Sequence, residues 1–180
     1  MYNLSRYKEP DRVVILEFMK KNSFAMLIGS QNDIPSATQV PLLIDERDGK
    51  IFLIGHIMRK QDHHLAFQKN PNVLALFTGP HTYVSASWYE NPHEASTWNY
   101  MSVHARGKLN FVDEAALVDS LRRLSLHYEN NNNASPTVYD NLPPADVAKM
   151  LKSIVGFEIE VSSIDHVFKL SQNRDEKSYD

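Results

Sequence analysis

The 180-residue chain contains no cysteine, which excludes disulfide bonds and thiolate metal ligands. It also has no apolar run close to the roughly 20 residues that a membrane-spanning helix needs. Its first residues, Met1 to Arg6, lack the apolar core of a secretory signal. The hydrophobic fraction of 42% and the charged fraction of 23% are ordinary for a globular protein. We therefore expect a cytoplasmic protein without membrane association.

A block of basic residues is also missing, and the net charge is −3. Phosphate neutralisation supplies much of the affinity of DNA-binding domains, so such domains usually display a basic face. No helix pair with the tight turn of a helix-turn-helix is visible. The sequence predicts that this chain alone binds DNA weakly.

Several catalytic signatures are absent as well. There is no nucleophile elbow, P-loop or GxGxxG motif, and Ser85 and Ser87 have no evident partner base. The eight histidines show no metal-binding spacing. A haem ligand stays open, because a single histidine suffices. No catalytic constellation can be assigned.

The pattern of apolar and turn-forming residues predicts one domain over residues 1–180. Helices are expected at 11–21, 59–69, 113–128 and 143–151. Strands are expected at 23–29, 36–44, 51–56, 73–77, 83–88, 154–161 and 167–170, with one or two more at 98–112 and a bulge at Gly107. Asp48-Gly49 lies between two of these strands and is a hairpin signal. Most strand connections are sequential, which favours an α+β fold: an antiparallel barrel with peripheral helices, including a helical segment at about 113–152.

A binding site is suggested where two neighbouring strands end. Arg59-Lys60 stands at the predicted mouth of a helix, and both side chains suit a phosphomonoester. A solvated helix start is the alternative interpretation. Pro41 lies in an apolar strand and must occupy an edge or a bulge, because proline forfeits a ladder hydrogen bond.

Aromatic residues gather around a predicted loop, at Tyr83, Trp88, Tyr89, Trp98 and Tyr100. Such density is typical of a core or a subunit interface. Stacking on a flavin is a second interpretation.

Segments along nearly the whole chain resemble the PaiB-like family of FMN-binding negative transcriptional regulators. They include Pro41-Leu42-Leu43, Gly55-His56 with Arg59, Gly79-Pro80-His81-Thr82-Tyr83, Thr97-Trp98-Asn99-Tyr100 and Ile154-Val155-Gly156-Phe157. The family is related to the FMN-binding split β-barrels, which include pyridoxamine-phosphate oxidases. The resemblance therefore implies a split barrel, a homodimer and FMN.

The resemblance also implies which residues bind the cofactor. Arg59 and Lys60 match the Arg-Lys pair that holds the FMN phosphate, and Gln39 and Val40 fall where backbone atoms meet the flavin ring. Thr38 stands where related proteins often have a phosphate-binding arginine, which predicts weaker FMN binding. His56 and Trp98 complete the predicted set. Three functions stay open: an FMN-binding regulator, a flavin-dependent oxidoreductase, and a haem-binding or haem-degrading split barrel.

Overall fold

The computed structural model describes residues 1–89 and 93–174. Its centre is a single antiparallel sheet of seven strands in the order β2-β1-β5-β6-β7-β4-β3. The strands are β1 (Phe24–Gln31), β2 (Ile34–Pro41), β3 (Leu43–Arg47), β4 (Lys50–Met58), β5 (Asn72–Val84), β6 (Thr97–Phe111) and β7 (Ile154–Lys169). The four α-helices are α1 (Arg12–Lys21), α2 (Asp62–Lys69), α3 (Glu114–Tyr128) and α4 (Pro144–Ser153). This architecture confirms the predicted α+β barrel with peripheral helices.

Short turns join the edge hairpins. Asn32 and Asp33 adopt left-handed φ values of 51° and 63° between β1 and β2, and Asp48 and Gly49 do the same between β3 and β4, at 52° and 75°. Two left-handed residues are what a two-residue hairpin turn of type I′ requires, and Asn, Asp and Gly tolerate that conformation best. The hairpin prediction at Asp48-Gly49 is confirmed.

Three strand predictions were wrong in their boundaries. The predicted strand at 36–44 is broken at Leu42 into β2 and β3, and those two strands lie at opposite ends of the sheet order. Conversely, one long strand, β5, spans the strand predicted at 73–77 and only the first two residues of the one predicted at 83–88, and Ala86–Trp88 form a 3₁₀ helix instead. Strand β7 replaces the two strands predicted at 154–161 and 167–170. Strand β5 continues through Gly79-Pro80 because the ladder shifts register between Thr78 and His81, and such an irregularity tolerates a proline without an N–H.

Strand β6 is one strand, with a register shift between Arg106 and Gly107 in its ladder with β7. This irregularity coincides with the predicted bulge. A Cβ at Gly107 would collide with the carbonyl oxygen of Glu160, so the two strands approach too closely there for any other residue.

Helix boundaries follow the capping residues. The side chains of Asp11 and Asp113 accept hydrogen bonds from backbone N–H groups in the first turns of α1 and α3, as expected for N-caps. Helix α4 begins at Pro144, a residue suited to the first helical position. Helix α2 begins only at Asp62, so the prediction that the helix starts at Arg59 was wrong.

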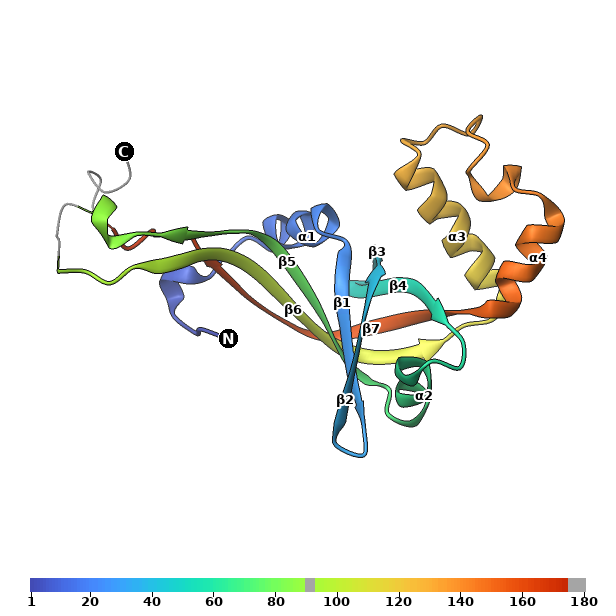
Figure 1. The fold of residues 1–180 in the computed structure, drawn as a ribbon, viewed down its shortest axis with the longest axis horizontal. Helices are drawn as coiled ribbons and strands as arrows, with labels where there is room; N and C mark the ends of the chain where they lie inside the picture. The colour runs from blue at the N-terminus through green and yellow to red at the C-terminus, as the bar shows by residue number, and fades with distance from the viewer. Residues whose placement is uncertain (90–92, 175–180) are drawn as a thin grey trace.

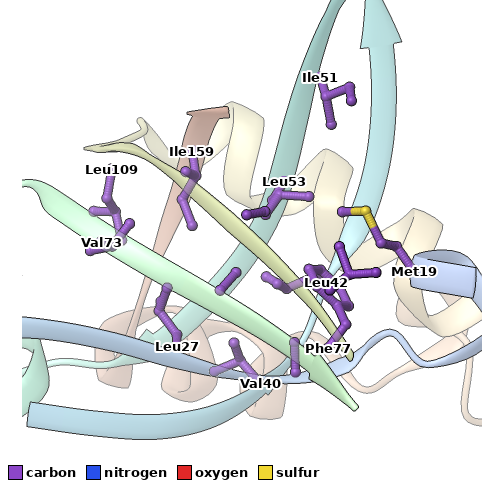
Figure 2. Packing of buried hydrophobic residues seen from close by; sticks show 14 of the residues in the cluster. Met19, Leu27, Val40, Leu42, Ile51, Leu53, Val73, Phe77, Leu109 and Ile159 are labelled. Atoms are coloured by element: carbon purple, nitrogen blue, oxygen red, sulfur yellow. The ribbon is translucent and has the colours of Figure 1, made fainter. Parts of the chain in front are cut away.

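The barrel interior is filled by one large apolar cluster (Figure 2). Leu27, Leu53, Phe77, Val103 and Ile159 are fully buried there. Successive residues of a strand point to opposite faces, so their neighbours along the strands face outward. A smaller cluster around Leu117, Leu121, Tyr139 and Ile154 lies between α3, α4 and the sheet.

The molecule is elongated, with the barrel between two extensions (Figure 1). Helices α3 and α4 form a helical lobe beyond β4 at one end. The first part of β6 and the last part of β5 form an arm at the other end. Among residues 1–89 and 93–174, no helix is both long and apolar enough to cross a bilayer.

Candidate functional site

A cleft opens where the chain leaves β2 and where β4 ends. It has a volume of about 390 Å³ and is lined by Thr38, Gln39, Val40, Pro41, His56, Ile57, Met58, Gln61, His63 and Ile154. Four of the seven predicted site residues, Thr38, Gln39, Val40 and His56, are therefore in one place. The sequence did not predict Ile57, Met58, Gln61, His63 and Ile154 as site residues, because their positions carry no distinctive motif.

One wall of the cleft is the free edge of β2. The N–H of Leu42 donates to the carbonyl of Ser23 at 2.9 Å. This bond shows that the even-numbered residues of β2 are the ones whose backbone groups bond to β1. Because an antiparallel ladder alternates, Val40 also bonds to β1, whereas the N–H and C=O of Gln39 face away from it. The backbone nitrogen of Pro41 faces away from β1, as that of Gln39 does, so its missing N–H costs no ladder bond. The edge-strand prediction for Pro41 is confirmed.

The opposite wall is the last part of β4. The N–H of Arg59 donates to the carbonyl of Ser153 at 2.9 Å, so the odd-numbered residues of β4 bond to β7. The backbone groups of His56 and Met58 consequently face the other side, where β3 has already ended at its pairing with Ile54. Two strand edges with free backbone donors and acceptors thus face each other.

Gly55 allows the two walls to approach. A Cβ on Gly55 would lie 2.9 Å from the ring of Phe157, 3.0 Å from the Leu42 side chain and 3.3 Å from the carbonyl oxygen of Pro41. Any larger residue would push the end of β2 outward. This glycine therefore sets the width of the cleft.

The side chains of β2 divide between the two faces of the strand. Val40 is buried and points into the barrel, Thr38 is half-buried on the same face, and Gln39 is exposed on the outer face. Thr38 brings a hydroxyl and no charge to the cleft. The charge of the site must come from the turn that follows β4.

Arg59 and Lys60 occupy that turn, between Met58 and the start of α2. Lys60 has a left-handed φ of 64°, and its N–H donates to Nδ1 of the buried His64 at 3.0 Å. His64 was not predicted, because its role depends on this contact between α2 and the turn that precedes it. Both basic side chains are exposed, and within residues 1–89 and 93–174 neither forms an ion pair.

Histidines on both sides of the turn are held neutral. Burial lowers the pKa of His56. Burial also lowers the pKa of His64, and the positive charge of Arg59 and the neighbouring His63 add to that effect. A neutral His64 can accept the Lys60 N–H through Nδ1, which stabilises the turn.

Trp98 lies outside the cleft. It stands near the start of β6 on the arm, and its ring centroid is 5.7 Å from that of Tyr83 and 6.1 Å from that of His81. Trp98 is 55% exposed and Trp88 is 66% exposed. Within one chain, the structure does not bring this predicted site residue to the others.

Comparison with known proteins decides the family. Residues 1–163 match the family model described as "Putative FMN-binding domain". The chain belongs to this family. It is also 34% identical to the PaiB protein of Bacillus subtilis (strain 168), named protease synthase and sporulation protein PAI 2, over 99% of this chain and 86% of that protein. The predicted family and its cofactor, FMN, are confirmed at this level.

Solved structures establish the fold independently. The FAD and heme binding protein from Mycobacterium smegmatis aligns with a TM-score of 0.63 and 13% identity over 93% of this chain and 75% of that chain. The flavocytochrome Anf3 from Azotobacter vinelandii aligns with a TM-score of 0.63 and 14% identity over 95% of this chain and 73% of that chain. At such low identity the likeness concerns the fold alone.

Proposed function

We propose that the cleft between β2 and β4 binds FMN, with the phosphate at Arg59 and Lys60 and the ring system along the edge of β2. The observation that carries this proposal is the arrangement of two free strand edges, of which β4 runs directly into a turn with two cations, neither of them ion-paired within the described residues. Free N–H and C=O groups suit the polar edge of a flavin ring. Exposed cations suit a phosphate dianion.

The rest of the cleft fits the same ligand. Its volume of about 390 Å³ lies within the range of about 300–1,000 Å³ typical of small-molecule sites. Met58, which is 56% exposed, provides apolar surface for a planar ring, and Thr38 provides a hydroxyl. FMN, when bound, supplies hydride and single-electron transfer, while the residues here bind it and exclude water.

Trp98 can contribute to the cleft only from a second copy of the chain. Phe24 and Met26 of β1 are 60% and 36% exposed, and Leu76, which pairs with Met26, is half-buried beside them. Gln39 pairs with Met26 on the other side, so this apolar patch adjoins the cleft. We propose that the patch is a homodimer interface and that the second copy's arm delivers its Trp98 to the cleft.

FMN titration of Arg59→Ala and Lys60→Ala tests the phosphate site. Losing one charge-assisted contact should weaken FMN binding about ten- to a hundredfold, equivalent to about 1.5–3 kcal/mol. Quenching of flavin fluorescence measures the dissociation constant. Lys69→Ala is the matched control, since Lys69 is an exposed lysine at the far end of α2. Parental affinity in both cleft variants would place the phosphate elsewhere.

The resemblance predicts a transcriptional regulator, and we propose that its regulatory activity depends on the bound flavin. The cleft offers a site where the redox state of a cofactor can alter the protein. We also propose that the protein is cytoplasmic.

A further inference from the structure

A second cavity lies behind the proposed FMN cleft, between β4 and the helical lobe. It has a volume of about 260 Å³, and its lining includes Leu121, Leu124, Tyr128, Tyr139 and Met150. His56 lines this cavity as well as the cleft. His56 is therefore the wall that the two spaces share.

The fold creates this cavity because the side chains of β4 alternate between its two faces. Leu53 and Ile57 are buried in the barrel, whereas His56 points outward toward α3 and α4. The helices pack on this outer face through the small cluster that contains Leu121 and Tyr139. A space remains above His56 between the strand and the helices.

The chemistry of the lining is selective. None of the described residues that line the cavity is Asp, Glu, Lys or Arg, so the lining offers a charged ligand no oppositely charged partner. Two tyrosines and a methionine offer aromatic and polarisable contacts. The surface favours an uncharged aromatic ring.

His56 and the hydroxyl of Tyr139 are the hydrogen-bonding side chains of this lining that form no hydrogen bond with another described residue. The hydroxyl of Ser125 already donates to the carbonyl of Arg122 at 3.0 Å and accepts the N–H of Tyr139 at 3.0 Å. The imidazole of His56 forms no hydrogen bond with any other residue in the described parts of the chain. Because burial lowers its pKa, the ring is neutral at pH 7 and can accept a hydrogen bond from a donor group of a ligand.

We propose that this cavity binds a small, uncharged, single-ring aromatic molecule whose hydroxyl group donates to His56. The volume is below the range of about 300–1,000 Å³ for drug-sized ligands, which limits the ligand to one ring. The shared wall places that molecule next to the flavin, and this adjacency rests on the proposed function. The cavity is the substrate or effector pocket of the protein.

Three one-ring probes separate the contributions: p-cresol, toluene and p-toluate. They share a ring and a methyl group and differ in their polar group. Binding to the protein, with and without added FMN, is followed by ligand-observed NMR. We expect p-cresol to bind about three- to tenfold tighter than toluene, as one neutral hydrogen bond allows, and p-toluate not to bind. In His56→Phe, p-cresol and toluene should bind equally.

Blocking variants locate the site. Met150→Trp, and independently Leu124→Trp, should abolish binding of p-cresol and toluene by filling the cavity. Lys149→Trp is the control, because Lys149 is exposed on α4 and does not line the cavity. FMN affinity is measured in every variant and should stay parental in the three tryptophan variants.

The outcomes distinguish this inference from the proposed function. Equal binding of p-cresol and toluene to the parent, preferred binding of p-toluate, or binding that survives both blocking variants would overturn the inference. Absence of all probe binding would overturn it too. Discrimination by His56 in a protein that fails to bind FMN would support the cavity and reject the proposed function.

Discussion

At the scale of single residues, Lys60 does two things in the site. Its backbone takes the left-handed conformation, at φ 64°, so that its N–H reaches His64. Its side chain is exposed and forms no ion pair among the described residues, and it precedes Gln61, which lines the cleft. We therefore expect the side-chain charge of Lys60 to act on FMN affinity and its backbone conformation to act on stability.

Lys60→Gly and Lys60→Ala separate these two roles. Both variants lose the charge, so both should bind FMN with the same reduced affinity. Glycine occupies the left-handed region without the penalty of roughly 1–2 kcal/mol that an L side chain carries, so Lys60→Gly should be more stable than Lys60→Ala by about that amount. Urea unfolding measures the difference. Parental FMN affinity in Lys60→Gly would mean that the turn geometry, and not the charge, governs binding.

At the scale of elements, one bidentate ion pair joins the helical lobe to the barrel, in addition to the packing of the small apolar cluster. Arg123 of α3 donates to both carboxylate oxygens of Asp45 on β3, at 3.0 Å and 2.5 Å. This pair is partly buried. The neighbouring Arg122 pairs with Asp140 at 2.7 Å, and both of those side chains are largely exposed. The two arginines therefore provide a matched comparison.

Arg123→Ala should destabilise the protein by about 1 kcal/mol, near the upper end for partly exposed ion pairs. Arg122→Ala should leave the free energy of unfolding unchanged, because its ion pair is solvated. Chemical denaturation of both variants at low and high salt measures these effects. An equal loss in the two variants would show that the Asp45 contact does not fasten α3 to the sheet.

At the scale of the whole molecule, we expect a partner surface to cover the apolar patch on β1 and the exposed aromatic arm. Monomeric proteins rarely leave such patches uncovered. An interface of obligate type would bury about 2,000 Å² or more in total. A second copy would cover the patch and complete the cleft at the same time.

Sedimentation of the parent at micromolar concentration should show a dimer. Phe24→Glu should shift it to monomer and weaken FMN binding, since the charge would be desolvated in the apolar interface. Val13→Glu, at an apolar residue of α1 that is 64% exposed, should leave the dimer intact. Trp98→Ala should weaken FMN binding while the dimer persists. A monomeric parent would contradict this prediction.

DNA binding should be weak and dependent on salt. The basic pairs at Lys20-Lys21 and Arg122-Arg123 are partly neutralised, since Lys20 pairs with Glu17 and both arginines pair with aspartates. Sequence-specific binding needs several phosphate contacts as well as contacts to base edges. Fluorescence anisotropy with upstream DNA at about 150 mM salt is the measurement. A nanomolar, sequence-dependent complex would reverse the prediction.

Much of the fold could be predicted from local signals in the sequence. Asp11 and Asp113 cap helices, Asp48-Gly49 turns a hairpin, and Pro41 marks an edge strand, because each depends on the conformational preferences of a few adjacent residues. The adjacent Arg59 and Lys60 could likewise be noticed as a pair. Their family resemblance then pointed to the cleft that Thr38, Gln39, Val40 and His56 line.

The tertiary structure decided what depends on contacts distant in sequence. The break at Leu42 sends β2 and β3 to opposite ends of the sheet, and only that arrangement leaves the edges of Gln39 and His56 free to face each other. The same holds for Gly55 beneath Pro41. Trp98 could be predicted as a candidate cofactor-binding residue, but its place on the arm followed from the long strands β5 and β6. Local preference sets turns and caps, whereas closure of the barrel sets which of their side chains meet.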